Sequence, residues 1–266
     1  MRRTLLFILL GFTTVSKAIN PERDYKITPD IRGLNYSEYQ LKTTDNYTIN
    51  VWEYGRLDSL KTDRTIILVG PDAGNISYLI WQANAFLNKG FRVIAFDYRG
   101  FGKSSDFAIN KDFLFYREFA LDLDSVIKAT REKYKNEKIG LYSLSMGTYI
   151  SLLRKEKVDF SIGEGFFHDP QKVVDRIKAN KKKETLLPRG TRPITQLSEG
   201  TPTMIFCATN DKTTMTEDAK EFAKQNKVSI IEFNGEHLSG MSVIQKNDYG
   251  DEYAEKVVEF LNKSGV

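Results

Sequence analysis

The chain has 266 residues, of which 41% are hydrophobic, 28% charged and 12% aromatic. These fractions are typical of a globular domain and exclude a disordered, collagen-like or coiled-coil protein. The formal net charge is +4, and the single cysteine, Cys207, excludes an intramolecular disulfide framework and a cysteine-rich zinc site. His168 and His237 are the only histidines, so any histidine chemistry depends on one of these two residues.

The first eighteen residues have the pattern of a secretory signal peptide. Arg2 and Arg3 precede a short apolar run, and small residues stand at Ser16 and Ala18. We therefore expect cleavage after Ala18 and export to a periplasm or to the exterior of the cell. An N-terminal anchor that is retained is the alternative, although the apolar run is shorter than the roughly 20 residues that a spanning helix needs.

Loss of residues 1–18 would remove Arg2, Arg3 and Lys17 but no acidic residue, which lowers the net charge from +4 to +1. A nearly neutral mature chain indicates no general polyanion partner, so we expect no nucleic-acid binding. Residues 19–266 contain no internal repeat, low-complexity segment or Pro/Gly-rich linker. We therefore expect them to form one domain.

The rest of the chain alternates between strand and helix patterns. Residues 37–42 and 47–54 alternate polar and apolar side chains around a polar turn, which predicts an antiparallel hairpin. Further strands are expected at 65–69, 92–96, 138–142, 158–162, 203–208 and 228–233, and helices at about 79–87, 113–134, 146–154, 217–224 and 252–261. This order predicts an α/β fold with a mainly parallel central sheet and helices on both faces. Ligands bind such sheets at the carboxyl ends of the strands.

A candidate nucleophile follows the predicted strand 138–142. The sequence Ser143-Leu-Ser145-Met-Gly147 is similar to Gly-x-Ser-x-Gly, the nucleophile elbow, in which small residues flank a serine at a sharp turn. If Ser143 were the nucleophile, bulky Leu141 would occupy the first small position, so the pattern favours Ser145. An exposed serine in an ordinary turn is the alternative interpretation.

A serine hydroxyl needs a base within hydrogen-bond reach to act as a nucleophile. His237 follows the last predicted strand, where a loop can bring it over Ser145. His168 is the competing base, but it precedes the penultimate strand. It therefore breaks the chain order of serine, acid and histidine that this architecture favours.

The base in turn needs a carboxylate that fixes its tautomer and stabilises the imidazolium. Asp211 follows the predicted strand 203–208, and the order Ser145, Asp211, His237 agrees with the expected one. Asp169 is the alternative acid, and Glu236 is a weaker one. We therefore expect a Ser145–His237–Asp211 triad.

With these motifs the chain resembles the α/β-hydrolases, in the branch of serine aminopeptidase-like and monoglyceride-lipase-like proteins, from about Tyr36 to Leu261. The segment 69–75 resembles the oxyanion loop of that family. The segment 97–104 matches Asp-x-Arg-Gly-x-Gly-x-Ser, which is a structural turn in the family. It is not a phosphate-binding P-loop, because the first glycine of such a loop would fall at Asp97.

The resemblance implies an oxyanion hole formed by the backbone N–H of Met146 and by one near Asp72. Many relatives have His-Gly where this chain has Gly70-Pro71. An aspartate beside a developing oxyanion is unfavourable unless its carboxylate points away. This departure keeps open a weakly active enzyme or a binding protein without catalytic activity.

Residues 164–202 are expected to form a short lid, since the family often inserts a substrate-covering segment here. The segment carries Phe166, Phe167 and Leu186 among basic residues. One interpretation is a cap over an apolar acyl pocket that makes a weak membrane-surface contact through Lys181–Lys183. The other is an ordinary solvated helix face, which charge runs usually form.

Together these features predict an exported serine hydrolase that cleaves carboxylic esters, of acyl or lysophospholipid type, through an acyl-enzyme. No metal or organic cofactor is implied, and the expected partner is a small-molecule ester. A serine peptidase is the alternative enzyme, because fold resemblance alone does not separate it from an esterase. The sequence makes no prediction about the oligomeric state.

Overall fold

The computed structural model describes residues 17–55, 63–197 and 200–266. Most of the predicted signal peptide, residues 1–16, and residues 198–199 of the predicted lid lie outside the described residues. Within those three ranges, no helix combines the length and hydrophobicity that crossing a membrane requires.

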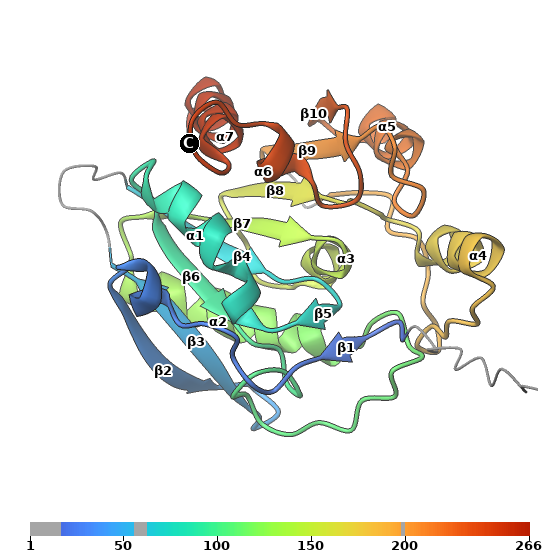
Figure 1. Cartoon of the computed structure of the whole chain (residues 1–266), viewed down its shortest axis with the longest axis horizontal. Coiled ribbons are helices and arrows are strands. Elements are labelled where there is room, and N and C mark those ends of the chain that lie inside the picture. The colour runs from blue at the N-terminus through green and yellow to red at the C-terminus, as the bar shows by residue number, and fades with distance from the viewer. Residues whose placement is uncertain (1–16, 56–62, 198–199) are drawn as a thin grey trace, which may run out of the picture.

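An eight-stranded sheet forms the centre of the molecule (Figure 1). Its strands in chain order are β2 (Tyr36–Lys42), β3 (Thr48–Tyr54), β4 (Arg64–Val69), β6 (Arg92–Phe96), β7 (Lys138–Leu144), β8 (Phe160–Glu164), β9 (Thr203–Ala208) and β10 (Val228–Phe233). Across the sheet their order is β10-β9-β8-β7-β4-β6-β3-β2. β2 and β3 pair antiparallel, β3 pairs antiparallel with β6, and all other pairs are parallel. The mainly parallel sheet predicted from the sequence is confirmed.

Helices cover both faces of this sheet (Figure 1). They are α1 (Ile80–Leu87), α2 (Glu118–Lys133), α3 (Met146–Leu153), α4 (Pro170–Lys181), α5 (Thr216–Gln225), α6 (Gly240–Val243) and α7 (Asp251–Lys263), with short 3₁₀ turns η1 (Pro29–Arg32) and η2 (Ile76–Leu79). Side chains of α1 and α7 share one apolar core with the sheet, and those of α2 and α3 share the other. Adjacent residues of β4, such as Ile66 and Ile67, point into opposite cores, which explains its continuous apolar run.

The first described residues lie along the carboxyl edge of the sheet. β1 (Asn20–Pro21) pairs in parallel with β5 (Ala73–Gly74), next to the predicted oxyanion loop. Ala18 and Ile19 are buried, and their backbone N–H groups donate to the carbonyl of Lys111 at 2.7 and 3.1 Å. The start of the predicted mature chain is therefore part of the packed fold.

Most element boundaries lie within two residues of the sequence prediction, and the start of α2 differs most. α2 begins at Glu118 and not near residue 113, because Phe113 forms a β-bridge with Leu186 and the N–H of Leu114 donates to the Leu186 carbonyl at 2.9 Å. β8 spans Phe160–Glu164 and not 158–162. In the first case a contact distant in sequence replaces local helix formation.

The turn after β6, with the sequence Asp97-x-Arg99-Gly-x-Gly, is closed by buried polar contacts. The Arg99 guanidinium, only 1% exposed, donates to both carboxylate oxygens of Asp45 at 2.6 and 2.9 Å and to Asp122 at 2.8 Å. Asp97 accepts from the backbone N–H of Ile76 at 2.9 Å. The turn thus fastens β6 to α2 and to the start of η2.

Candidate active site

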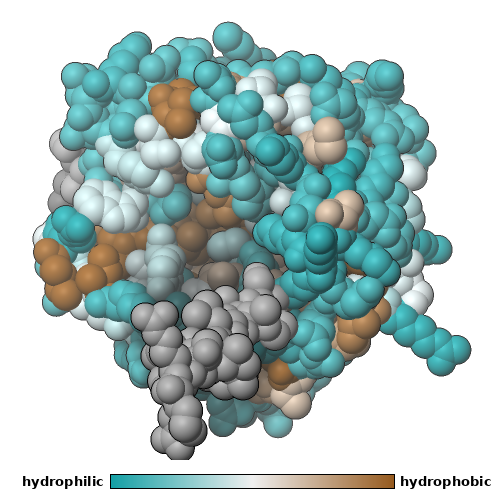
Figure 2. Space-filling model, turned by 45° about the vertical axis from the view of Figure 1, so that its right-hand side comes forward, coloured by the Kyte–Doolittle hydropathy of each residue, from teal (hydrophilic) through white to brown (hydrophobic). Residues whose placement is uncertain are grey.

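A pocket opens at the carboxyl edge of the sheet, where β7, β9 and β10 end. The face turned forward in Figure 2 is hollowed, with hydrophobic residues inside the hollow and mostly hydrophilic ones around it. The cavity has a volume of about 140 Å³, and Ser145, Met146, His237 and Asp72 are among the residues that line it. The structure therefore brings predicted site residues from separate strand ends to one cavity.

Ser145 stands between β7 and α3 in a strained backbone conformation, with φ 49° and ψ −116°. Non-glycine residues seldom adopt positive φ, and such strain persists only when neighbouring contacts hold it. Here the N–H of Ser145 donates to the Glu164 carbonyl at 2.9 Å, and its own carbonyl accepts from the N–H and hydroxyl of Thr148 at 2.8 and 2.7 Å. These contacts fix the serine at the tip of a sharp turn.

The small residues around Ser145 have a steric reason. A Cβ atom at Gly147 would lie 2.4 Å from the carbonyl oxygen of Val69 and 2.7 Å from that of Gly70. Only glycine therefore lets α3 start so close to the end of β4. Ser143 is buried and its hydroxyl lies 2.7 Å from that of Ser151, so it does not line the pocket with Ser145.

The side chains of Ser145, His237 and Asp211 form a continuous hydrogen-bonded chain. His237 Nε2 lies 3.0 Å from the Ser145 hydroxyl, and His237 Nδ1 lies 2.6 Å from Asp211 Oδ2. Thr214 donates its hydroxyl to the same Asp211 oxygen at 2.5 Å, and both Thr213 and Thr214 donate backbone N–H groups to Asp211 Oδ1. In this arrangement Asp211 orients the imidazole and the imidazole faces the serine hydroxyl.

The surroundings keep Asp211 ionised. Burial alone would raise the pKa of this carboxyl, but the hydrogen bonds from His237 and Thr214 outweigh burial and hold its pKa below the ordinary value. An ionised Asp211 requires the proton on His237 Nδ1, which leaves Nε2 free to accept the proton of the Ser145 hydroxyl.

The other histidine lies elsewhere. His168 is buried, its Nδ1 lies 3.1 Å from the Ile194 carbonyl, and its ring packs 5.1 Å from that of Phe222. It is not among the residues that line the pocket with Ser145. Of the alternative acids, Asp169 caps the start of α4 by accepting from the N–H of Gln171 at 3.0 Å. Glu236 is exposed and does not line the pocket either.

Glu164 is a positioning residue that the sequence did not single out. Its backbone carbonyl holds the N–H of Ser145, and its side chain accepts from the N–H of Gly240 at 2.6 Å, three residues after His237. Burial raises the pKa of the Glu164 carboxyl, although the Gly240 hydrogen bond opposes this rise. One residue thus anchors both the serine turn and the histidine loop. The sequence prediction placed Glu164 at the start of the lid, because it ended the preceding strand at residue 162, whereas Glu164 is the last residue of β8.

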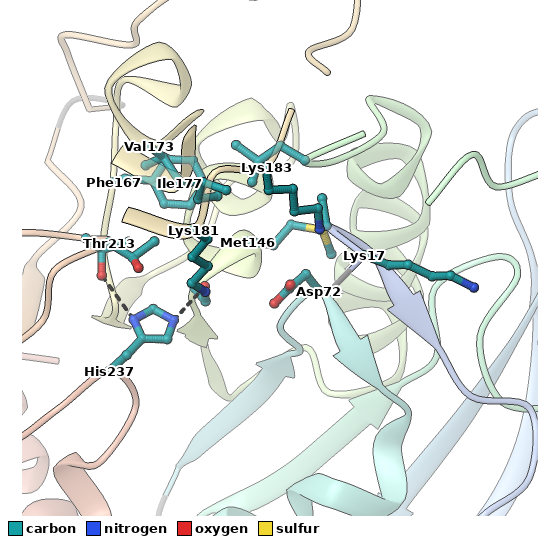
Figure 3. Close-up of a pocket in the computed structure, with 14 residues that line it drawn as sticks. Lys17, Asp72, Met146, Phe167, Val173, Ile177, Lys181, Lys183, Thr213 and His237 are labelled. Atoms are coloured by element: carbon teal, nitrogen blue, oxygen red, sulfur yellow. Dashed lines mark hydrogen bonds between the residues drawn. The ribbon is translucent and has the colours of Figure 1, made fainter. Parts of the chain in front are cut away.

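The predicted oxyanion hole has one clear donor and one unusual neighbour. Met146 is the first residue of α3, so its N–H has no acceptor within the helix, and Met146 lines the pocket together with Ser145. Asp72 lies across the pocket, and its carboxylate points into the cavity and not away from it (Figure 3). Burial raises the pKa of this carboxyl, and its own backbone N–H opposes the rise. An aspartate here would not disfavour the oxyanion if its carboxylate pointed away from the site, and this condition is not met.

The remaining walls of the pocket are formed by apolar residues, two threonines and three lysines. Their residues are Leu114, Phe167, Val173, Ile177, Thr213, Thr214, Lys17, Ala18, Lys181 and Lys183. Among the described residues, no cluster of three histidine, cysteine or acidic side chains is arranged to hold a metal ion.

Sequence comparison with known proteins gives one partial match. The family model described as serine aminopeptidase, S33, matches residues 76–161, a segment that contains Ser145 but neither Asp211 nor His237. A search of curated proteins finds no match.

Solved structures match over nearly the whole chain. An esterase from Pyrococcus furiosus is 21% identical with a TM-score of 0.73, and the match covers 92% of this chain and 97% of the esterase. An α/β serine hydrolase homologue from Coxiella burnetii is 19% identical with a TM-score of 0.59, over 85% and 97% of the two chains. An acylaminoacyl peptidase from Pyrococcus horikoshii is 13% identical with a TM-score of 0.61, over 87% of this chain but 42% of the peptidase.

These matches define the class of protein: the chain has the α/β-hydrolase fold, of the type found in serine hydrolases and esterases. Within that class, the segment from η2 to the start of β8 is similar to the serine aminopeptidase family.

Proposed function

We propose that this protein is a serine hydrolase that cleaves carboxylic esters through an acyl-enzyme. One observation carries the proposal: the Ser145 hydroxyl lies 3.0 Å from His237 Nε2, while His237 Nδ1 lies 2.6 Å from Asp211. Hydrogen bonds of this length in this order activate a serine as a nucleophile. The similarity in fold to esterases supports the same conclusion.

In the proposed acylation step, Ser145 Oγ attacks the ester carbonyl carbon and His237 Nε2 takes the hydroxyl proton. The resulting oxyanion accepts hydrogen bonds from the backbone N–H groups of Met146 and Asp72. Asp211 stabilises the imidazolium that forms. When the intermediate collapses, the bond to the alcohol breaks and the alcohol oxygen takes the proton from His237.

Deacylation repeats these steps with water as the nucleophile. His237 takes a proton from water, the hydroxyl attacks the acyl carbon, and Ser145 leaves with the proton that the imidazolium returns. The products are a carboxylic acid and the free enzyme. All the groups required are on this chain.

The test is covalent labelling with a fluorophosphonate, a reagent that reacts with activated serines. We expect labelling of the wild type and none of Ser145→Ala. Ser143→Ala is the matched control, because Ser143 lies two residues earlier, in β7, and does not line the pocket. Ester hydrolysis by Ser145→Ala should fall by about 10⁴-fold or more. If the folded wild type is not labelled, the chain is a binding protein on a hydrolase scaffold.

A peptidase is the second candidate, favoured by the match of residues 76–161 to a serine aminopeptidase family. Esters and amides pass through the same tetrahedral intermediate, so the triad alone serves both. A series of p-nitrophenyl esters assayed beside aminoacyl-anilides separates the two activities. We expect kcat/KM to be far higher for the esters, and the reverse result would establish the peptidase.

We further propose that the protein is exported and that cleavage after Ala18 gives the mature chain. The pattern of Arg2, Arg3, a short apolar run and small residues supports this. The cut would leave the new α-amino group on Ile19, whose nitrogen already lies 3.1 Å from the Lys111 carbonyl. It would also remove Lys17 and Ala18, which line the pocket. Mass spectrometry of the exported protein should find Ile19 as the first residue, and retention of residues 1–18 would instead indicate an anchor.

A further inference from the structure

Three consecutive lysines follow one another at the edge of the pocket, and only two of them face it. α4 ends at Lys181, and Lys182 adopts the left-handed conformation with φ 50° as the helix cap. This conformation turns the chain so that Lys181 and Lys183 both line the pocket, whereas Lys182 is exposed and does not line it. Figure 3 shows the side chains of Lys181 and Lys183 reaching into the cavity from the end of α4.

Neither of these two ammonium groups is neutralised by a close carboxylate. Within the three described ranges of the chain, Lys181 and Lys183 make no ion pair, although nearby Lys178 pairs with Glu184 at 2.8 Å. Lys183 is half-buried, and burial lowers the pKa of its ammonium group while the more distant Asp112 and Asp72 oppose this. The Lys181 side chain stays exposed, whereas burial of Lys183 without a close partner has a desolvation cost. An anion that bound both ammonium groups would offset this cost.

The rest of the cavity limits how large a substrate with such an anionic group can be and where it can bind. Apolar side chains surround the reacting serine, among them Leu114, Met146 and Phe167. The cavity volume of about 140 Å³ favours a small ligand. Asp72 is the only acidic side chain lining the pocket. It is also the group with which an anionic substrate would compete for the lysines.

We propose that the substrate is a small ester that carries an anionic group, a carboxylate or a phosphate, which Lys181 and Lys183 bind while Ser145 attacks the ester carbonyl. This rests on the proposed esterase function and names its substrate class. The two lysines are specificity residues, since they contact the substrate away from the reacting atoms. The alternative interpretation of the three lysines, an ordinary solvated helix face, then applies to Lys182 alone.

The test compares esters that differ only in charge. p-Nitrophenyl valerate and mono-p-nitrophenyl glutarate place the charge on the acyl side, and p-nitrophenyl acetate and 5-acetoxy-2-nitrobenzoate place it on the leaving group. For at least one pair, we expect the ratio of kcat/KM, anionic over neutral, to fall about tenfold in Lys181→Gln or Lys183→Gln and further in the double variant. Lys182→Gln removes the same charge one residue away, so its ratio should match the wild type. Added salt should lower the wild-type ratio.

The outcomes separate this inference from the esterase proposal. If neutral esters are cleaved by Ser145 but both ratios are the same in the double variant and in Lys182→Gln, the inference is wrong and the esterase proposal stands. If no ester is cleaved and the fluorophosphonate does not react, the esterase proposal itself fails. If the double variant loses binding to vesicles of anionic phospholipid while both ratios are unchanged, the lysines bind a membrane surface and not the substrate.

Discussion

Two hydrogen-bonded groups of side chains at the carboxyl edge of the sheet both contain aspartate, but they differ in whether a substrate can reach them. The Arg99 group, formed by Arg99 with Asp45 and Asp122, is closed, because the guanidinium is 1% exposed and its donors are taken by carboxylates. The Ser145 group is open, because the His237 side chain is 34% exposed and, within residues 17–55, 63–197 and 200–266, the serine hydroxyl has only His237 as its partner. A closed group has no free atom to offer a substrate, whereas an open one keeps a proton that can move.

This difference also predicts whether substitutions in each group affect mainly the stability of the fold or mainly the activity. Ionic groups that are fully buried stabilise the fold only as complete sets, since removing one member leaves an unpaired charge. Ser145 instead has an unfavourable backbone conformation that neighbouring contacts maintain. The Arg99 group should therefore tolerate substitution poorly in stability, and the Ser145 group poorly in activity.

The largest effect on stability is expected for Arg99→Met. This change leaves Asp122, which is fully buried, without its guanidinium partner, so the free energy of unfolding should fall by about 3–5 kcal/mol. Urea unfolding followed by circular dichroism measures it. The molecules that remain folded should still react with the fluorophosphonate, because Arg99 does not line the pocket.

The double variant Arg99→Met/Asp122→Asn is the control for that interpretation. Replacing the unpaired carboxylate with a neutral amide should recover part of the lost stability, since the desolvated charge is gone. Equal unfolding midpoints for the single and double variants would show that Arg99 acts through packing and not through charge.

An intermediate effect is expected at Glu164, which contacts both the turn of Ser145 and the loop that carries His237. In Glu164→Ala the N–H of Gly240 loses its acceptor at 2.6 Å, and the loop that carries His237 loses an anchor. A displacement of about 1 Å costs about 10²-fold in rate, so kcat should fall by roughly that factor with a smaller change in KM. Stopped-flow measurement of fluorophosphonate labelling reports the same loss directly.

Glu164→Gln distinguishes positioning from a general loss of structure. Glutamine keeps an oxygen that can accept from Gly240, so it should restore most of the labelling rate. If Gln is as slow as Ala while both variants remain folded, the charge of Glu164 and not its hydrogen bond is what the site requires.

The sequence predicted the parts of the site that depend on local pattern and chain order. Ser145, Asp211 and His237 each follow a strand, and a parallel sheet brings strand ends together whatever the details of packing. The same reasoning identified Gly147, because a sharp turn requires a small residue there. Their contact geometry is a property of the structure, and their catalytic roles remain predictions that the labelling experiment tests.

The parts that could not be predicted depend on contacts distant in sequence or on side-chain direction. The role of Glu164 depends on a hydrogen bond to Gly240, 76 residues away. The division of the three lysines depends on one left-handed residue, Lys182, a conformation that the sequence pattern did not indicate. Likewise, the position of Asp72 was predicted, but the direction of its carboxylate follows from tertiary packing.

The smallest effect is expected for Asp72→Asn, which keeps the backbone N–H of the oxyanion hole and removes a carboxylate from the pocket. An ionised Asp72 repels the developing oxyanion, so its removal should raise kcat for neutral esters by up to about tenfold, or about 1.4 kcal/mol. Because burial raises the pKa of Asp72 in the folded protein, this carboxyl is neutral in acid and becomes charged as the pH rises through that raised value. The gain from Asp72→Asn should therefore be small at low pH and grow with increasing pH.

The effect of Asp72→Asn on the free energy of unfolding should also grow with increasing pH. A carboxyl whose pKa is raised by folding costs nothing below its unfolded pKa, and the cost develops as the pH rises from that value through the folded one. Asp72→Asn should thus raise Tm at pH 8 and leave it unchanged near pH 3, as differential scanning calorimetry at the two pH values will show. A variant that is slower than the wild type at every pH would mean that the Asp72 carboxylate assists the reaction. In that case Asp72 would be a functional part of this site, and the open group of residues would include it.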